Sequence, residues 1–329
     1  MQKFINNPDT LTEEMLQGLL LAHSELITLE AGNLVVNKKL AEADRVTIVT
    51  LGGSGNEPAL GGFVGEGMVD VAVVGDVFAA PGPQACIEAI KLADKGKGVL
   101  LVVLNHAGDM LAGNLAMKQA EKLGLKVAKI VVQEDIANAT REEAHNRRGM
   151  VGCVPLYKIA GAAAHAGKSL EEVTAIVQSF ADNMATLAVG VSGATNPVTG
   201  MDIAQVAAGN MEVGVGLHGE AGNSKAMKTA DETVALMLDA LLEDLNVQAE
   251  EKLLVIVNGS GATSLMEQLI IFRSCYAYLA QKDIVVVASY VGELMTVQEM
   301  AGFQLCVARM DEELLAYWNA PCFTPYFKK

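Results

Sequence analysis

Short continuous runs of hydrophobic residues alternate with helical patterns through the first half of the chain. Four such runs predict buried strands, at residues 45–51, 71–74, 99–104 and 127–132. Between them, residues 84–95 and 110–123 repeat apolar positions at helical spacing, and Gly124 ends the second of these segments. Fully apolar strands separated by helices are typical of a mainly parallel sheet that is covered on both faces.

The second half shows the same alternation after a long Ala-rich helical stretch at residues 154–184. We expect Gly167 to end one helix in this stretch and Ser169 to cap the next. Further strands are predicted at residues 253–257, 284–288 and 303–309, and further helices at residues 231–245, 263–281 and 311–318. The sequence therefore predicts an α/β protein with two domains, residues 1–185 and 186–329, each a mainly parallel or mixed sheet covered by helices.

Composition excludes several classes of protein. Hydrophobic residues make up 51% and charged residues 19% of the 329 residues, so the chain is not intrinsically disordered. No apolar run approaches the roughly 20 residues that span a bilayer. The first residues, MQKFINNPDT, lack the apolar region of a secretory signal. We therefore expect a cytoplasmic protein that makes no contact with a membrane.

The balance of charge disfavours direct contact with nucleic acid. The chain has 24 Lys and Arg residues against 39 Asp and Glu residues, which gives a net charge of −15. Its densest basic spot is Arg147-Arg148. Because phosphates repel an acidic surface, we expect no nucleic acid among the partners.

The cysteines and histidines do not form a metal-binding pattern. The five cysteines are odd in number and widely spaced, with no CxxC pair, so we expect buried thiols rather than a zinc site or disulfides. No two of the five histidines have the short spacing of ligands on one helix face. The sequence therefore predicts no metal site.

Two segments match nucleotide-binding motifs by letter only. Residues 214–219 read GVGLHG, which fits GxGxxG, but residues 209–213 before them are a poor strand pattern and the residues after them are loop-like. Gly167-Lys168-Ser169 resembles the end of a phosphate-binding loop, yet Ala162 stands where that loop needs a glycine. We therefore expect no nucleotide cofactor bound by this chain.

Four loops leave the carboxyl ends of predicted strands, where ligands bind in open α/β sheets. They span residues 52–58, 75–81, 105–109 and 258–263. The turn at residues 53–56 (GSGN) is rich in N–H groups and suits a small polar ligand. Asp109 can either orient a polyol hydroxyl or cap the following helix, and His106 can border a pocket.

His218 lies among four glycines, at positions 214, 216, 219 and 222. Glycines on both sides let the backbone approach a ligand closely and leave the imidazole as the main chemical group. The same pattern fits a turn histidine that makes surface hydrogen bonds. The pattern alone leaves both interpretations open.

Taken together, five stretches resemble the substrate-binding subunit of dihydroxyacetone kinases over essentially the whole chain. They read LGGSGNEPALGGFVGEGMVDVAVVGDVFAAP, NHAGDM, RRGMVGCVPLYKIAGAAA, MEVGVGLHGEAG and DEELLAYWNAPCFTPYF. The resemblance implies a homodimer of two-domain α/β chains that bind dihydroxyacetone. In phosphotransferase-linked members of this family a separate helical subunit carries ADP, so ADP and Mg²⁺ are expected only on a partner subunit.

The resemblance also assigns roles to five residues. His218 matches the family histidine whose imidazole adds to the ketone of dihydroxyacetone as a covalent hemiaminal. Glycerol has no carbonyl and cannot form this bond. Asp109 matches the family aspartate that hydrogen-bonds the substrate. The backbone cradle of the family is matched by Gly53, Ser54 and Gly55.

The chain departs from the active kinases of this family at the cradle. Those kinases read GGGSGHEP, and the histidine of the motif acts as general base on the hydroxyl that receives phosphate. Here Leu51 replaces the first glycine and Asn56 replaces the histidine. An amide has no useful basicity, and the loss of a general base typically costs roughly 10²- to 10⁴-fold in rate. Ser260 also stands where the family tends to have a larger apolar residue, which alters the expected docking surface for the nucleotide subunit.

Two functions from different classes follow from the resemblance and its departures. We favour a non-catalytic sensor that captures dihydroxyacetone at His218 and, like a coactivator of this family, associates with a TetR-type activator of the kinase operon. The acidic chain would then contact the activator and leave DNA to it. The alternative is a dihydroxyacetone-binding subunit of a phosphotransferase-dependent kinase, for dihydroxyacetone or a related keto-sugar.

Overall fold

The computed structural model describes residues 3–329, and contacts group these residues into two compact units. The N-terminal unit comprises residues 3–132, 153–179 and 316–329, and the C-terminal unit comprises residues 133–152 and 180–315. The single boundary after residue 185 that the sequence suggested does not describe this division. Residues 133–152 join the C-terminal unit, where Asp135 bridges Thr186, before the chain returns to the N-terminal unit.

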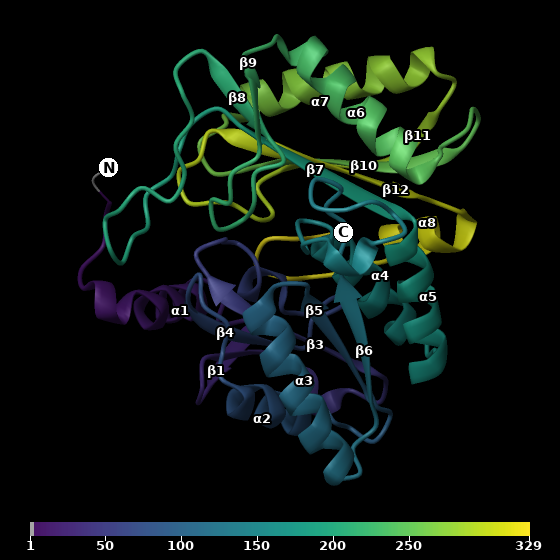
Figure 1. Cartoon of the computed structure of the whole chain (residues 1–329). Coiled ribbons are helices and arrows are strands. Elements are labelled where there is room, and N and C mark those ends of the chain that lie inside the picture. The colour runs from purple at the N-terminus through teal and green to yellow at the C-terminus, as the bar shows by residue number, and fades with distance from the viewer. Residues whose placement is uncertain (1–2) are drawn as a thin grey trace. The chain divides into compact units, whose positions relative to one another are not determined.

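Six strands form the sheet of the N-terminal unit, in the order β1-β2-β4-β3-β5-β6 (Figure 1). Their bounds are β1 Ile27–Glu30, β2 Leu34–Asn37, β3 Thr47–Ser54, β4 Val71–Val77, β5 Val99–Leu104 and β6 Val127–Val132. The neighbouring strands β4, β3, β5 and β6 run parallel to one another, while β1 and β2 are antiparallel additions at one edge. The predicted mainly parallel sheet is therefore confirmed, and β5 and β6 occupy the predicted residues.

Helices cover both faces of this sheet because side chains alternate along its strands. The helices in this part of the chain are α1 Leu11–Ala22, α2 Pro83–Ala93, α3 Ala107–Lys122, α4 Cys153–His165 and α5 Leu170–Asp182. α2 and α3 pack on the face that carries Val49 and Leu51. α4 packs on the other face, where the hydroxyls of Tyr157 and Thr50 are hydrogen-bonded at 2.8 Å.

The Ala-rich stretch at residues 154–184 divides into helices α4 and α5, as the signals at Gly167 and Ser169 predict. The Ser169 hydroxyl accepts a hydrogen bond from the Glu172 N–H at 3.2 Å, and Glu172 accepts one from the Ser169 N–H at 2.8 Å. These reciprocal bonds begin α5.

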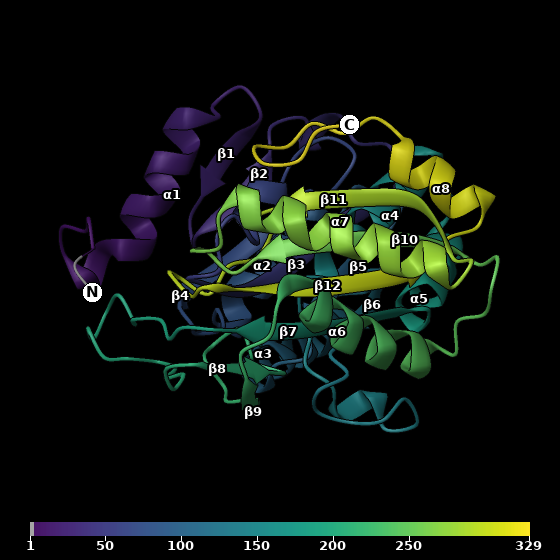
Figure 2. The same ribbon diagram turned by 90° about the horizontal axis from the view of Figure 1, so that it is seen from above.

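The sheet of the C-terminal unit has the strand order β11-β10-β12-β7-β8-β9. The remaining elements are β7 Met184–Gly190, β8 Asn210–Val213, β9 Asn223–Ala226, α6 Ala230–Leu245, β10 Lys252–Gly259, α7 Leu265–Gln281, β11 Val285–Gly292, β12 Gly302–Arg309 and α8 Glu312–Asn319. β10 and β11 pair in parallel and the other neighbours pair antiparallel, so this sheet is mixed. α6 and α7 lie side by side against one face of it (Figure 2).

The GxGxxG letters at residues 214–219 lie between two strands. The preceding residues form β8, so the expectation of a poor strand there was wrong. β9 follows the glycine-rich turn where a dinucleotide site would need a helix. The segment is thus the connection of an antiparallel β8–β9 pair.

Two further expectations concern the whole chain. All five cysteines are buried and free, which confirms the prediction of core thiols. Within residues 3–329, no helix is long and apolar enough to cross a bilayer.

Candidate functional site

The glycine-rich end of β3 forms a tightly enclosed loop, which we call the cradle and define as residues 53–56. Gly53 lies opposite Gly75 in the parallel ladder of β3 and β4. A Cβ atom at Gly53 would lie 2.8 Å from the backbone nitrogen of Ala79 and 2.9 Å from its carbonyl oxygen. The loop after β4 therefore approaches the cradle so closely that only glycine fits at position 53.

Hydrogen bonds from neighbouring segments hold the cradle. The hydroxyls of Ser54 and Thr12 of α1 are 2.9 Å apart, and both residues are buried. The Ser54 carbonyl accepts the Phe78 N–H at 2.9 Å. The Gly55 N–H donates to Oε1 of Glu57 at 2.9 Å, so this N–H serves the loop itself. The cradle is therefore a pre-formed, rigid feature.

Asn56 and Asp109 are buried polar residues of this unit, 6% and 7% exposed. Asp109 lies in the first turn of α3, whose N-cap residue is His106, so Asp109 is not the capping residue. A Cβ atom at Gly52 would lie 3.9 Å from Oδ2 of Asp109, which places this carboxylate beside the strand that enters the cradle. Asp109 therefore lies beside Gly52, one residue before the cradle.

Leu51 belongs to the core and not to the cradle. Its side chain is fully buried among residues of α2 and α3. A Cβ atom at Gly113 of α3 would lie 3.6 Å from Cδ2 of Leu51, an ordinary van der Waals distance, so the leucine side chain reaches the surface of α3. The departure from glycine at position 51 therefore changes packing, whereas Asn56 changes the chemistry of the loop.

His218 lies in a tight turn of the C-terminal unit after β8. The Gly216 N–H donates to the Glu220 carbonyl at 2.9 Å, and the Gly219 N–H donates to the Gly216 carbonyl at 3.3 Å. A Cβ atom at Gly216 would overlap both the Glu220 carboxylate and the guanidinium of Arg148. Glycine at this position therefore allows two opposite charges to approach the turn.

The Glu220 carboxylate is the immediate partner of His218. Its Oε1 lies 3.6 Å from Nδ1 of the imidazole, and its Oε2 accepts the His218 backbone N–H at 3.0 Å. Burial alone would raise the pKa of Glu220, but the hydrogen bonds that its carboxylate accepts outweigh this effect and hold the pKa at about 2. The His218 side chain is 32% exposed. An ionised carboxylate beside Nδ1 favours the imidazole tautomer that carries its proton on Nδ1.

Arg148 fixes the start of this turn. It donates from Nε to Oδ2 of Asp135 at 2.8 Å and from Nη2 to the Gly214 carbonyl at 2.9 Å. Burial raises the pKa of Asp135, although Arg148 opposes the rise. Sequence reasoning noted Arg148 only as part of a basic pair and missed this role, because its partners lie far away along the chain.

A buried carboxyl group supports the segment that carries Arg148. Glu134 is 2% exposed and accepts the N–H groups of Met150 at 3.1 Å and Gly152 at 2.8 Å. Burial raises its pKa to about 7. No sequence pattern indicated this group.

The loop at residues 258–263 is largely internal. The Asn258 amide donates to the Met295 carbonyl at 2.7 Å and accepts the Leu294 N–H at 2.7 Å. Ser260 is 1% exposed. The Ser260 side chain therefore does not reach the surface, and an effect of this departure on docking of a nucleotide subunit stays a prediction.

The fold and the cradle define a two-unit α/β protein with a buried, glycine-rich loop at the end of a parallel strand. The chain belongs to the Dak1 domain family, whose model matches residues 17–326. It is 37% identical over 313 residues to the dihydroxyacetone-binding subunit DhaK of a PTS-dependent dihydroxyacetone kinase from Lactococcus lactis, which covers 95% of this chain and 94% of that protein. It is 36% identical over 330 residues to a D-erythrulose kinase of Mycolicibacterium smegmatis, which covers all of this chain and 57% of that protein.

Solved structures that resemble this chain come from the same group of dihydroxyacetone kinase proteins. The dihydroxyacetone kinase operon co-activator Dha-DhaQ superposes with a TM-score of 0.90 at 30% identity, over 95% of this chain and 97% of that chain. The dihydroxyacetone kinase of C. freundii superposes with a TM-score of 0.89 at 30% identity, over 99% of this chain and 60% of that chain. The family includes both kinases and a co-activator, so the choice between these functions depends on individual residues.

Proposed function

We propose that this protein is a dihydroxyacetone sensor that captures the ketone covalently on His218 and acts as a coactivator of a dihydroxyacetone kinase operon with a TetR-type regulator. One observation supports the proposal: the residue that the resemblance aligns with the general base is Asn56, which is buried at the end of the cradle, while His218 has a carboxylate partner. Capture of the ligand is supported and proton removal is not.

The capture step follows from the chemistry of the His218 turn. Nε2 attacks the carbonyl carbon, a C–N bond forms, and the electron pair of the C=O π bond moves to oxygen, which takes up a proton from water. The imidazole loses its Nδ1 proton to water, and the product is a neutral hemiaminal. The ionised Glu220 carboxylate stabilises the positive charge that the ring carries between these proton transfers.

In the N-terminal unit, we assign recognition of hydroxyl groups to the cradle and to Asp109. The buried Asp109 carboxylate can accept a hydrogen bond from a substrate hydroxyl, and Asn56 can hold one through its amide. An amide cannot take the proton of that hydroxyl. A rate loss of roughly 10²- to 10⁴-fold in phosphoryl transfer is the expected consequence.

Mass measurement of the intact native protein tests the capture. Dihydroxyacetone should add the mass of one ligand per chain, glycerol should add none, and His218→Ala should abolish the adduct. His218→Gln, which keeps a polar side chain of similar size, is the matched control for a change in packing. An adduct that persists in His218→Ala would exclude this histidine as the nucleophile.

The alternative is a dihydroxyacetone- or erythrulose-binding kinase subunit, which the similarity to DhaK subunits and to a D-erythrulose kinase favours. In that case ADP and Mg²⁺ would be held by a separate subunit. Incubation with an ADP-bearing subunit of a homologous kinase and a phosphoryl donor distinguishes the two functions. The sensor should form no ketose phosphate, and Asn56→His should leave the adduct intact; turnover by the unmodified chain would establish the alternative.

Both functions include a second copy of the chain. We propose a homodimer, which the resemblance to two-domain dimeric subunits suggests. Sedimentation with and without dihydroxyacetone, followed by titration with a TetR-type activator encoded beside the gene, would measure both assemblies. A sensor should bind the activator in a ligand-dependent way.

A further inference from the structure

Strand β11 is an edge strand of the C-terminal unit whose outer side is open. Within residues 3–329, it pairs with β10 along one side and with no strand along the other. Every residue of β11 is exposed or half-buried, although its neighbour β10 is buried from Leu253 to Gly259. A free edge presents a row of backbone N–H and C=O groups, which pair readily with another strand. β11 can therefore accept a further strand.

The other edge strands of the two described sheets carry features that oppose such pairing. β1 and β9 are only four residues long, β9 includes Lys225, and β6 includes Lys129. Short length and an edge lysine are common protections against association between strands. β11 has eight residues, reads VVVASYVG and contains neither a charged residue nor a proline. Among these four edge strands it is the unprotected one.

Helix α7 adds an exposed apolar face beside this edge. α7 packs on β10 and β11 (Figure 2). Leu265, Leu269 and Tyr276 lie four and seven residues apart, so they share one face of the helix, and each is more than half exposed. Tyr276 and Val285 line a groove of about 470 Å³ at the start of β11. A contiguous apolar surface of this kind indicates an interaction site.

A second copy of the chain would cover the edge and the helix face at once. A two-fold axis perpendicular to the sheet reverses the direction of a strand and keeps each face of the sheet on the same side. The two β11 strands would therefore pair antiparallel, and the two α7 helices would lie next to each other across the axis. Their apolar faces would cover each other, and the two six-stranded sheets would become one continuous sheet.

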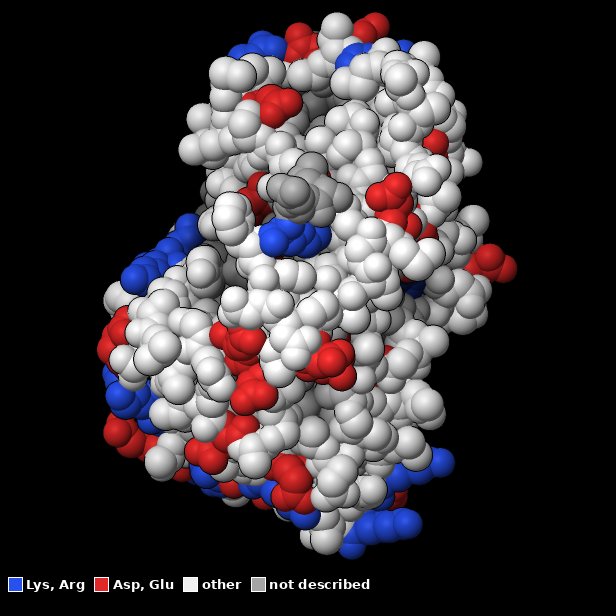
Figure 3. Space-filling view, turned by 90° about the vertical axis from the view of Figure 1, so that its left-hand side faces the viewer, with Lys and Arg blue, Asp and Glu red and all other residues white. Residues whose placement is uncertain are grey.

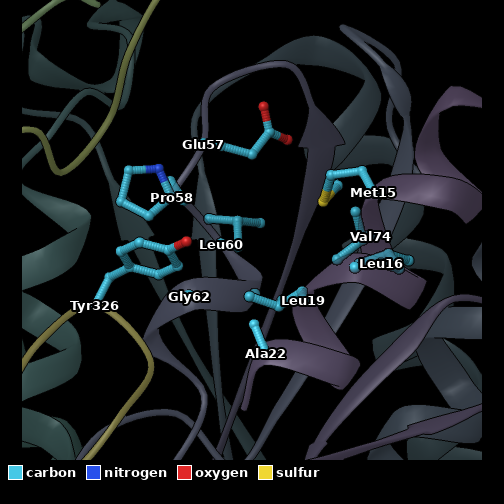
Figure 4. Close-up of a pocket in the computed structure, with 13 residues that line it drawn as sticks. Met15, Leu16, Leu19, Ala22, Glu57, Pro58, Leu60, Gly62, Val74 and Tyr326 are labelled. Carbon is cyan, nitrogen blue, oxygen red and sulfur yellow. The ribbon is translucent and has the colours of Figure 1, made fainter. Parts of the chain in front are cut away.

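Charge favours this edge over the other apolar hollow of the surface. Two copies of a chain with a net charge of −15 repel each other unless they meet at an uncharged surface. The N-terminal unit has an apolar cavity of about 400 Å³ between α1 and residues 57–62 (Figure 4). However, the first turn of α1 exposes Glu13 and Glu14, and Figure 3 shows acidic side chains gathered on the lower half of the face that carries α1. A second acidic chain is therefore accommodated better at β11.

We propose that β11 is a self-pairing edge to which a second copy of this chain binds, with the β11 strands antiparallel and the α7 helices in contact across a two-fold axis. This inference rests on the homodimer of the proposed function and assigns the surface through which that homodimer forms. The capture of a ketone on His218 does not depend on it.

Sedimentation of Ser289→Lys tests this surface. Ser289 is exposed and lies at the middle of β11, so centred pairing brings its two copies close together at the axis. The two lysines would repel each other, and the dissociation constant of the dimer should rise at least about tenfold. Ser224→Lys is the matched control, because it adds the same charge to exposed β9 at the opposite edge of the same sheet, and its dimer should persist. Circular dichroism should be unchanged in both variants.

Hydrogen exchange locates the interface in the unmodified protein. Backbone N–H groups of residues 285–292 should exchange more slowly in the unmodified dimer than in Ser289→Lys at the same concentration. A dimer that persists in Ser289→Lys, with equal exchange along β11, would overturn this surface and leave the homodimer standing. A chain that stays monomeric at every concentration would overturn both. The ketone adduct is measured separately, so the capture step can stand in either case.

Discussion

The cradle of the N-terminal unit and the His218 turn of the C-terminal unit are both glycine-rich loops, yet they present their side chains differently. Ser54 and Asn56 are 2% and 6% exposed, whereas the His218 side chain is 32% exposed. The cradle continues a central parallel strand, and the turn connects two short antiparallel strands at the edge of a sheet. Recognition of hydroxyls requires a fixed shape, while a nucleophile must admit a ketone and exchange protons with water.

The two loops are also held by different forces. Backbone contacts enclose the cradle, where Gly53 lies against Ala79. Charges hold the turn, where Glu220 contacts His218 and Arg148 ties Gly214 to Asp135. The cradle should therefore respond to added volume, and the turn should respond to changes of charge and of pH.

Gly53→Ala should produce the largest change in stability. The added methyl would lie within 3.0 Å of three backbone atoms, and backbone cannot move aside as a flexible side chain can. We expect the free energy of unfolding to fall by about 3 kcal/mol, as overpacking of enclosed positions typically costs. Urea denaturation measures this difference.

Gly18→Ala is the matched control for that change, since it also adds one methyl to a glycine of the same unit. Gly18 lies within α1 and has open space around it, so the free energy of unfolding should rise by about 1 kcal/mol. A Gly53→Ala protein as stable as Gly18→Ala would show that the loop after β4 adapts and that the cradle is not rigid.

The free energy of unfolding should fall as pH rises, because Glu134, which supports the segment next to the His218 turn, loses its proton. Its pKa rises from 4.5 unfolded to about 7 folded, so the native state binds this proton more tightly than the unfolded state. The contribution of the Glu134 proton to the free energy of unfolding is therefore complete below pH 4.5 and is lost as pH rises to 7. Because a tenfold difference in proton affinity is worth about 1.4 kcal/mol, we expect a loss of about 2 to 3 kcal/mol across this range.

Comparison with Glu134→Gln isolates this contribution from other titrating groups. The glutamine carbonyl can still accept the Gly152 N–H, and no proton binds at this position. The difference between the two stability curves should slope from pH 4.5 to 7 and be flat above. A flat difference throughout would mean that Glu134 ionises at its ordinary pKa.

The elements that could be predicted from sequence are those with a nearly continuous apolar, β-branched run. β5 is apolar and buried throughout, β6 has Lys129 as its one polar residue, and the bounds of both strands match the prediction. β9 is exposed at every residue, and β7 begins inside an Ala-rich run, so neither carries a strand pattern. Local pattern also cannot show that residues 133–152 join the C-terminal unit, because that depends on distant partners.

The same distinction applies to the functional residues. Glycine spacing and position after a strand made the cradle and His218 candidates, since these are local properties of the chain, and the resemblance to the family assigned their roles. Glu220, Arg148 and Glu134 act through contacts that only the folded chain creates. The charge network was therefore missed, while the His218 turn that it supports was found.

Glu220→Gln should weaken the adduct without a comparable effect on stability. The amide keeps the size of the side chain but loses the charge that orients Nδ1 and stabilises the ring during attack. We expect the equilibrium for adduct formation to fall by about tenfold, a free energy of about 1.4 kcal/mol. Native mass spectrometry across a dihydroxyacetone series measures it. An unchanged equilibrium would assign Glu220 to the shape of the turn alone.

Ser54→Ala should have the smallest effect and separates rigidity from direct ligand contact in the cradle. It removes the hydrogen bond to Thr12 and should lower the free energy of unfolding by about 1 kcal/mol, the usual net contribution of a buried hydrogen bond. Thr12→Ser keeps a hydroxyl at the other end of the same hydrogen bond and should lower the free energy of unfolding by less. Because the proposed capture step takes place on His218, both variants should still form the adduct. If Ser54→Ala lost the adduct while its stability stayed normal, the serine hydroxyl would be a ligand contact, and the cradle would recognise its ligand by side-chain bonds in addition to shape.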